Sequence, residues 1–256
     1  MNKDQIIQSR FILSELIKKG IRLKYRRSYL GILWSLLEPL LTMIVLTIVF
    51  GTLMGVKERS FPVYILSGRL LYGFFAQSTT AALKSIRANS SIIKKVYVPK
   101  MLYPLSAILF NFVIFLISLI VLVLVAVILG VYPSVYIIQA IPALVVLLLL
   151  SLGCGMILST VGVFFRDMEY LWTIALMLIM YTCAIFYKAD KLLASKWSFV
   201  LKANPLFSVI ECFRSAVFGH PLNIHYLIYA TIFGAVALLI GILIFKKNED
   251  KFILEI

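Results

Sequence analysis

The sequence predicts an all-α integral membrane protein with six transmembrane helices. Of the 256 residues, 62% are hydrophobic and 14% are charged, and the mean hydropathy is +1.02. Soluble domains are about 45–50% apolar and about 25% charged, so a soluble fold is excluded. A membrane-spanning helix needs about 17–25 residues that are predominantly apolar. Six stretches meet this requirement, at residues 31–54, 62–83, 101–130, 136–165, 170–187 and 222–245.

An amphipathic helix is predicted at residues 4–27, ahead of the first span. Its apolar residues recur at helical spacing, and its basic residues fall on the opposite face. So basic a helix is expected to lie in the headgroup plane of the anionic, cytoplasmic leaflet. The dispersed apolar residues do not form the core of a signal peptide. A solvated helix of a soluble region is the alternative interpretation.

The distribution of basic residues predicts the orientation of the chain. Of the 25 lysines and arginines, 17 lie on the side that carries both termini, the loop after the second span and the turn after the fourth. The other side carries 7, and Arg69 lies inside a span. Cytoplasmic loops are enriched in Lys and Arg, so both termini are expected in the cytoplasm. The same enrichment accounts for the net charge of +14 without nucleic-acid binding.

The long segment at residues 188–221 is then external. It ends in NPLFSVIECFRSAVFG, whose apolar residues, Phe213 among them, form a stripe at helical spacing. Asn204 is the expected N-cap of this helix and Pro205 its first residue. The stretch is too short and too interrupted to cross the membrane. We therefore expect external re-entrant or surface helices before the last span.

Two charged residues fall inside predicted spans. Burying either Glu38 or Arg69 in lipid costs about 2.5–3.5 kcal/mol, so each is expected to face a cavity or a partner. Their positions predict depths that differ by ~8 Å or more, which leaves a direct contact open. One interpretation is a hydrated path for a polar or anionic substrate. The other places Glu38 at the membrane interface and extends Arg69 outward to water.

Aromatic and small residues recur along the spans. Most of the aromatic residues are typical of interface belts or packing, and others are suited to stacking on sugar rings inside a channel. Gly51 with Gly55, and Ser151 with Gly155 and Ser159, are spaced four residues apart. This spacing allows helices to approach closely, and these residues are candidates for contacts in a homodimer.

Motifs for catalysis and metal binding are missing from the sequence. It has no GxxxxGK[ST] phosphate loop, no HExxH and no GxSxG. Its three cysteines form no CxxC pair, so neither a zinc site nor a disulfide framework is predicted. We expect no catalytic residue, no metal and no cofactor on this chain, and the energy for its work must come from another protein.

Four stretches together resemble one known family. They are LKYRRSYLGILWSLLEPLL at the first span, SIRANSSIIKKVYVPKMLYPLS between the second and third, VFFRDMEYLW between the fourth and fifth, and NPLFSVIECFRSAVFG before the last. In this order they resemble the ABC-2 type exporter permeases, in particular those that export O-antigen, capsule and teichoic acid. The resemblance covers nearly the whole chain.

This resemblance implies a permease subunit that moves a lipid-linked polysaccharide or teichoic acid outward from the cytoplasmic leaflet. It implies a homodimer in the cytoplasmic (inner) membrane, bound to two copies of an ABC ATPase that carries the ATP and Mg²⁺. Residues 90–97 match the coupling helix that docks on the ATPase. There Ser90 or Ser91 is expected as the cap, the apolar residues fill a groove of the ATPase and the lysines meet its acidic rim.

Arg69 departs from the family pattern, in which many relatives are expected to have an apolar residue at this position. The candidate site residues form four groups. The groups are the coupling helix (Ser90, Ser91, Ile92, Ile93, Lys94, Lys95, Val96 and Tyr97), the cytoplasmic turn (Arg166, Asp167 and Glu169), the lining of a channel between spans one and five (Trp34, Glu38, Arg69, Tyr72, Trp172 and Tyr181) and the external gate (Asn204, Pro205, Phe213 and Arg214).

Two other classes of function stay open from the sequence. A membrane enzyme that acts on lipid-linked sugars needs a polar catalytic cluster at one membrane face, whereas the external titratable residues are scattered. An ABC exporter for a drug, lipid or peptide more often carries a large external domain or a fused ATPase.

Overall fold

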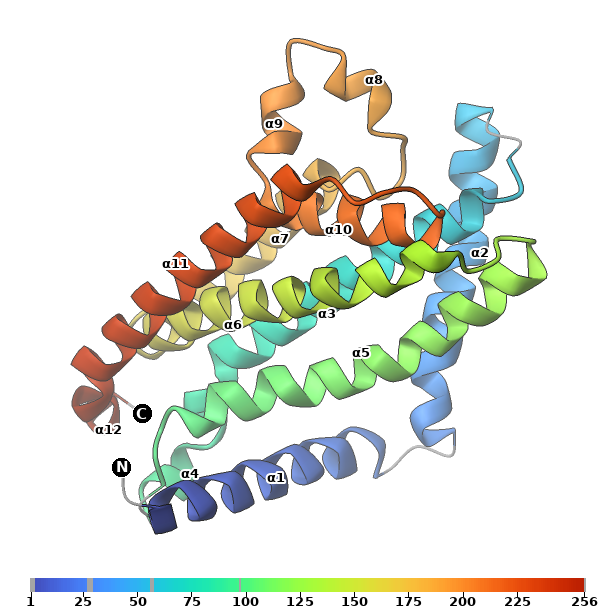
Figure 1. The fold of residues 1–256 in the computed structure, drawn as a ribbon. Helices are drawn as coiled ribbons and strands as arrows, with labels where there is room; N and C mark the ends of the chain where they lie inside the picture. Colours follow the sequence, from blue (N-terminus) through green and yellow to red (C-terminus); the bar gives the residue numbers. More distant parts are fainter. Residues whose placement is uncertain (1–2, 27–29, 56–57, 97, 256) are drawn as a thin grey trace.

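The computed structural model describes residues 3–26, 30–55, 58–96 and 98–255. Throughout these ranges the regular elements are helices without any strand, which confirms the all-α fold class (Figure 1). The long helices are α1 (Lys3–Tyr25), α2 (Trp34–Met54), α3 (Phe61–Ala88), α5 (Leu102–Ile128), α6 (Ala140–Phe164), α7 (Met168–Thr182), α10 (Pro205–Val217) and α11 (Ile224–Asn248). The short ones are α4 (Ser90–Ile93), α8 (Asp190–Leu193), α9 (Ser198–Lys202) and α12 (Phe252–Glu255), with 3-10 turns η1 (Gly31–Leu33), η2 (Val135–Gln139) and η3 (Glu249–Lys251).

Four helical stretches in these ranges are long and apolar enough to cross a membrane. They are Trp34–Leu53, Leu102–Ile128, Val135–Phe164 and Ile224–Glu255. Helix α7 is apolar but has only 15 residues, and α3, with 28 residues, carries Arg69, Lys84 and Arg87. The chain is a multi-pass membrane protein, and the count of six spans stays a prediction.

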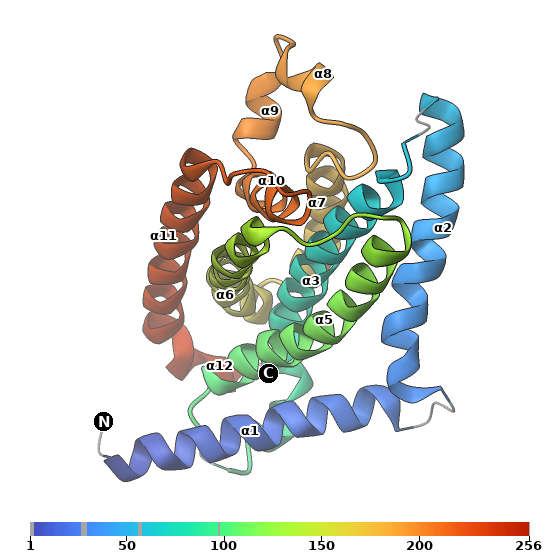
Figure 2. The same ribbon diagram turned by 45° about the vertical axis from the view of Figure 1, so that its right-hand side comes forward.

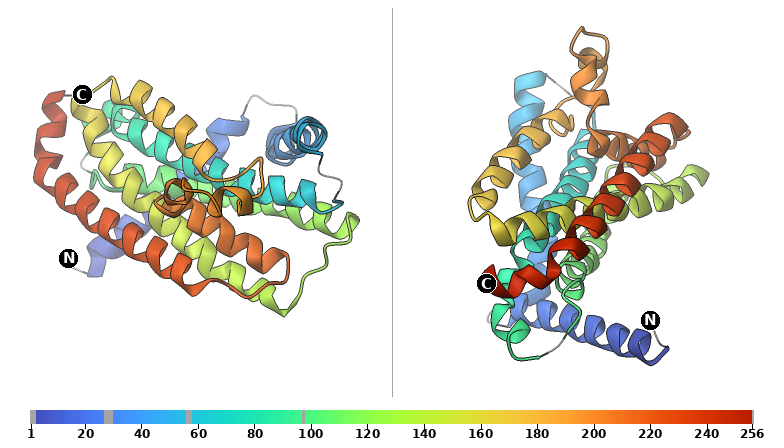
Figure 3. Two further views of the ribbon diagram at one scale, coloured as in Figure 1. Left: turned by 90° about the horizontal axis from the view of Figure 1, so that it is seen from above. Right: turned by 90° about the vertical axis from the view of Figure 1, so that its left-hand side faces the viewer.

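Helix α3 is the centre of the bundle. It packs against α2, α5, α6, α7 and α10, and most of its side chains are buried. Helix α11 runs alongside α6 (Figure 3). Their backbones approach closely at Gly153, where a Cβ atom would lie 2.7 Å from the backbone nitrogen of Leu238. Any larger residue at this position would push the two helices apart.

Helices α1 and α2 lie at the margin of the bundle (Figure 2). Helix α1 crosses α5, where Gly20 faces the ring of Phe110. Ile7, Phe11 and Leu23 on α1 are each at least 60% exposed. An amphipathic helix that leaves such side chains uncovered is suited to a membrane surface. Its location in the membrane interface stays a prediction.

Helix α7 ends five residues before the end of the predicted span at 170–187. Ala184 has a φ of 48°, in the left-handed region that interrupts a helix of L-residues. Its carbonyl oxygen accepts hydrogen bonds from Arg214 Nη1 (3.0 Å) and from the Tyr64 hydroxyl (3.2 Å). These bonds stabilise the turn and come from distant parts of the chain. The local sequence around residue 184 therefore does not predict that the helix ends here.

Candidate transport path and its two ends

Glu38 and Arg69 line the same cleft, between α2, α3 and α5, and Lys24 of α1 lines it too. The sequence predicts different depths for the two residues, because Glu38 lies near the cytoplasmic start of the first span and Arg69 near the external start of the second. Instead, the Ser118 hydroxyl, well along α5, donates a hydrogen bond to the Ser35 carbonyl in the first turn of α2 (2.9 Å). This offset along α5 brings Glu38 to the level of Arg69.

The cleft combines charged, polar and apolar walls. It holds one carboxylate and two cations, and the ion pairs among the described residues do not join Glu38 to either cation. Burial lowers the pKa of Lys24, and the carboxylate of Glu38 acts in the opposite direction. The remaining lining consists of Ser35, Pro39, Thr42, Leu70, Gly73, Phe74, Gln77, Asn111, Ile114, Phe115 and Ser118. Such a site suits a polar or anionic group with an apolar attachment.

Two of the predicted channel residues brace helices instead. The Tyr72 hydroxyl donates to the Leu176 carbonyl (2.8 Å), and Trp172 Nε1 donates to Thr79 Oγ1 (3.1 Å). Both bonds join α3 to α7. Tyr72 is only 6% exposed, which corrects the expectation that its ring lines a channel.

Trp34 and Tyr181 occupy uncovered faces of α2 and α7. Trp34 is 49% exposed and Tyr181 is 52% exposed. Both therefore stay candidates for a surface completed by another molecule. Neither of them lines the charged cleft.

The predicted coupling helix at 90–97 is shorter in the structure and partly buried. Helix α4 covers only Ser90–Ile93, and Asn89 stands at its N-cap position without a capping side-chain hydrogen bond. Neither Ser90 nor Ser91 is the cap, which corrects that expectation. Ile93 is 8% exposed and packs in a small core with Ile86, Tyr103 and Phe245, so it is not free to enter a groove of another protein.

The exposed part of the coupling segment follows α4. Lys94 and Lys95 are exposed, Val96 is 56% exposed and Ile92 is half-buried. Tyr97, the last predicted residue, lies outside the described residues. The surface that this segment offers is therefore basic, with one accessible apolar side chain.

In the predicted cytoplasmic turn, Glu169 has a defined role. Its carboxylate pairs with Lys84 Nζ (3.0 Å) and Arg87 Nη1 (3.7 Å), which joins the start of α7 to the end of α3. Arg166 and Asp167 are exposed. The pairs are partly exposed, so their contribution to stability is about 1 kcal/mol or less.

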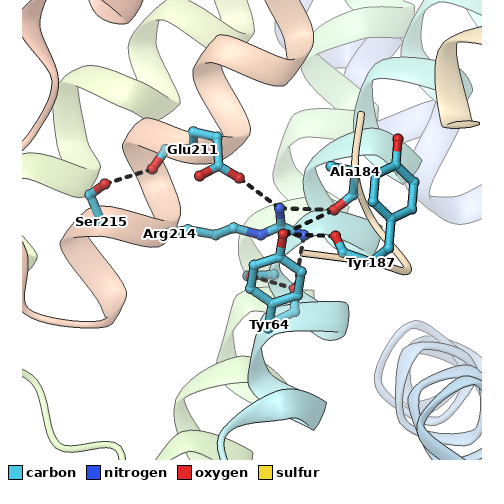
Figure 4. Close-up of polar contacts among 7 residues, drawn as sticks. Tyr64, Ala184, Tyr187, Glu211, Arg214 and Ser215 are labelled. Carbon is cyan, nitrogen blue, oxygen red and sulfur yellow. Dashed lines mark hydrogen bonds and ion pairs between the residues drawn. The ribbon is translucent and has the colours of Figure 1, made fainter. Parts of the chain in front are cut away.

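At the end of the bundle away from the termini, Arg214 is a buried clamp (Figure 4). It is 2% exposed and stacks 3.5 Å from the centre of the Tyr64 ring. Nη1 donates to the Ala184 carbonyl (3.0 Å) and pairs with Glu211 Oε1 (2.9 Å), and Nη2 donates to the Tyr64 carbonyl (3.2 Å). The Tyr64 hydroxyl also donates to the Tyr187 carbonyl (3.0 Å). Arg214 thus joins α10, α3 and the turn after α7.

The start of α10 follows the sequence prediction. Asn204 Oδ1 accepts from the Leu206 amide (3.0 Å) as the N-cap, and Pro205 is the first helical residue. Asn204 Nδ2 also donates to Thr182 Oγ1 (2.9 Å) at the end of α7. Phe213 is 4% exposed and belongs to the main core, so its ring does not stand free as a gate.

Sequence reasoning missed Tyr64 and the ion pair between Lys188 and Glu58. Lys188 Nζ lies 2.6 and 2.8 Å from the two carboxylate oxygens of Glu58. These partners are 130 positions apart, and the Arg214 to Tyr64 bond spans 150 positions. No periodicity or local motif links residues at such separations.

Together the fold and these sites define a membrane transport protein: a helical bundle with a charged cleft among its apolar helices and an exposed basic segment at the end that carries the termini. The chain belongs to the ABC-2 type transporter family, whose profile matches residues 13–218. This match confirms the family expected from the four motifs.

Several relatives are similar over nearly the whole chain. The chain is 31% identical over 242 residues to an O-antigen export system permease protein RfbA of Klebsiella pneumoniae, a match that covers 94% of this chain and 93% of the relative. It is 28% identical over 244 residues to a polysialic acid transport protein KpsM of Escherichia coli, covering 92% of each. An RfbA permease of Myxococcus xanthus is 25% identical over 219 residues, covering 85% of this chain and 84% of the relative.

Proposed function

We propose that this chain is the permease subunit of an ATP-driven exporter of a lipid-linked surface polysaccharide. The observation that carries the proposal is its similarity, end to end, to permeases whose names specify O-antigen export. The charged cleft supports it, because charged side chains among membrane helices mark the paths of polar substrates. Teichoic acid is a further cargo of the same chemical class.

In this mechanism the cleft takes the polar group that joins the glycan to its lipid. Arg69 and Lys24 supply donors and positive charge for an anionic oxygen, and Gln77 and Asn111 supply neutral hydrogen bonds. Glu38 keeps the cleft from holding that anion so tightly that release becomes slow. The apolar walls accommodate the beginning of the lipid chain.

A second copy of the chain completes the transporter. Helices α2 and α7 leave broad apolar faces uncovered, with Leu41, Ile48, Ile174 and Leu178 each at least 55% exposed. Apolar side chains that are exposed together on one helix face are typical of contacts with lipid or with another subunit. A channel between these faces of two copies would place Trp34 and Tyr181 along it.

Energy comes from a separate ABC ATPase, in two copies, which binds the ATP and Mg²⁺, while this chain holds no cofactor and no metal. The protein resides in the cytoplasmic (inner) membrane with both termini in the cytoplasm, and it binds no nucleic acid.

The docking surface for the ATPase consists of Lys94, Lys95 and Val96, because these residues are exposed and follow directly on α4. Ile93 anchors that surface to the core, so a push on the segment reaches α3 and α5.

Three variants test this function in cells that export the glycan and in the purified complex. The double variant Lys94→Glu with Lys95→Glu is expected to lose export and ATPase binding, and Lys196→Glu, an exposed charge reversal at the other end, is its control. Glu38→Ala is expected to lower export while the ATPase still copurifies. Full export by Glu38→Ala would remove the cleft from the path.

Export unchanged by the double lysine variant would refute the docking assignment. A chain that copurifies with no ATPase and converts a lipid-linked sugar by itself would establish the enzyme alternative. Export is measured in the cells, and the second outcome is read from the purified preparation, by mass spectrometry of the copurified proteins and by product analysis.

A further inference from the structure

A second cavity, of about 400 Å³, opens at the end of the bundle away from the termini. Three distant segments form its walls, and the contacts of Arg214 hold residues of these segments together (Figure 4). Its volume falls within the range of about 300–1,000 Å³ that is typical of small-molecule sites. The lining residues are Glu58, Ser60, Phe61, Tyr64, Lys188, Ala189, Asp190, Glu211, Arg214, Ser215, Phe218 and His220.

The charges of this cavity are unequal. Its two cations are already paired, Lys188 with Glu58 and Arg214 with Glu211. A third carboxylate, that of Asp190, leaves a surplus of negative charge. Ionised carboxylates only accept hydrogen bonds, so the cavity favours a ligand rich in donors and disfavours an anion.

A metal ion does not explain the carboxylates. Among the described residues, no group of three or more His, Cys, Asp or Glu side chains is close enough to hold one. The Ser215 hydroxyl donates to the backbone carbonyl of Glu211, so its oxygen stays available on the wall as a further acceptor. Tyr64 and Phe218 add apolar surface.

We propose that this cavity is a saccharide subsite, which takes a neutral or amine-bearing sugar unit and discriminates against acidic sugars. Sugar hydroxyls donate to the carboxylates and to the Ser215 hydroxyl oxygen, and the sugar's C–H edges pack on the aromatic rings. The proposal rests on the proposed function, and it adds this cavity to the path as a site at the end of the bundle away from the termini. It assigns to this chain a glycan with few acidic units.

The test measures binding of methyl glycosides to the purified full-length chain in lipid nanodiscs by saturation-transfer difference NMR. The probes are the methyl glycosides of a neutral hexose, a 2-aminohexose and a hexuronic acid, each at millimolar concentration. The neutral and amino glycosides are expected to give signals, and the hexuronide is expected to bind about tenfold more weakly, because of one like-charge contact.

Variants place the signals in the cavity. Ser60→Trp fills it and is expected to abolish binding of all three glycosides, and Ser215→Leu serves the same purpose if Ser60→Trp does not fold. Glu58→Gln removes a carboxylate and frees Lys188, so the hexuronide signal is expected to rise about tenfold. Glu15→Gln, an exposed change on α1, is the matched control and is expected to change nothing.

The proposal is overturned if no glycoside gives a signal, if the wild-type chain prefers the hexuronide, or if the signals survive both cavity-filling variants. The assay needs neither the ATPase nor export. A negative result with intact export therefore removes the subsite and leaves the proposed function standing. Glycoside binding by a chain that exports no glycan would keep the subsite and refute the proposed function.

Discussion

Gly68 is the position at which the Arg214 clamp can be tested most sharply. A Cβ atom at Gly68 would lie 2.5 Å from Arg214 Nη2 and 3.3 Å from Cζ. The guanidinium is not free to swing aside, because Nη2 donates to Tyr64 and Nη1 is held by Ala184 and Glu211. The variant Gly68→Ala must therefore break at least the Nη2 bond.

The change in the free energy of unfolding for Gly68→Ala follows from two opposing effects. Losing a hydrogen bond from a charged donor costs about 1.5–3 kcal/mol. Replacing glycine by alanine inside a helix returns about 1 kcal/mol. Gly68→Ala is thus expected to destabilise the protein by about 0.5–2 kcal/mol. At about 2–4 °C per kcal/mol for a chain of this size, its Tm falls by about 1–8 °C.

Gly73 provides the matched control on the same helix. Nothing lies within 4 Å of a Cβ atom there, so Gly73→Ala is expected to raise Tm by about 2–4 °C from helix propensity alone. The assay is thermal unfolding of both variants in the same detergent, followed by intrinsic fluorescence and by retention on size exclusion.

A double variant completes the test. Arg214→Lys keeps the positive charge but has no Nη2 atom, so adding Gly68→Ala to it is expected to cost at least 1 kcal/mol less than in the wild type, about the energy of the lost bond. If Gly68→Ala raises Tm as much as Gly73→Ala does, the guanidinium is not held against Gly68 and the clamp as described here is refuted.

Three further predictions concern single side chains. Phe252→Ala is expected to cost about 3–5 kcal/mol, because this ring is fully buried against Phe245, whereas Leu254→Ala, at 86% exposed, stays within about 0.5 kcal/mol; equal Tm values would contradict the packing. Burial raises the pKa of the Cys212 thiol to about 12, so maleimide is expected to label it only after unfolding at any pH from 7 to 9, and rapid labelling of a native protein in which Cys212 is the only cysteine would contradict its burial. Glu169→Gln is expected to lower Tm by less than about 4 °C, since its pairs are partly exposed, and a larger drop would show a stronger brace.

Local interactions were predictable because their partners are neighbours in the chain. Asn204 caps α10 through an amide two residues ahead, and Pro205 starts that helix, both as residue preferences predict. The all-α fold was predictable for a related reason. In lipid a backbone must satisfy its own hydrogen bonds, and long apolar runs do so as helices.

The charged cleft and the buried coupling residue were not predictable. Glu38 and Arg69 line one cleft because α2 begins alongside Ser118 of α5, an offset that no pattern in either helix encodes. The resemblance implied that Ile93 fills a groove of the ATPase, yet it packs on α3, α5 and α11. Which face of a short helix is covered depends on elements far away in the sequence.

The sequence by itself determined the membrane class, the helical fold, the order of the motifs and the family, because apolar length and local motifs act over a few turns of chain. Only the tertiary structure decided which charges share a cleft, which aromatic rings brace helices and what Arg214 holds. Those contacts join residues up to 150 positions apart. Their existence depends on how the helices are offset and rotated against one another, which is settled by packing of the whole bundle.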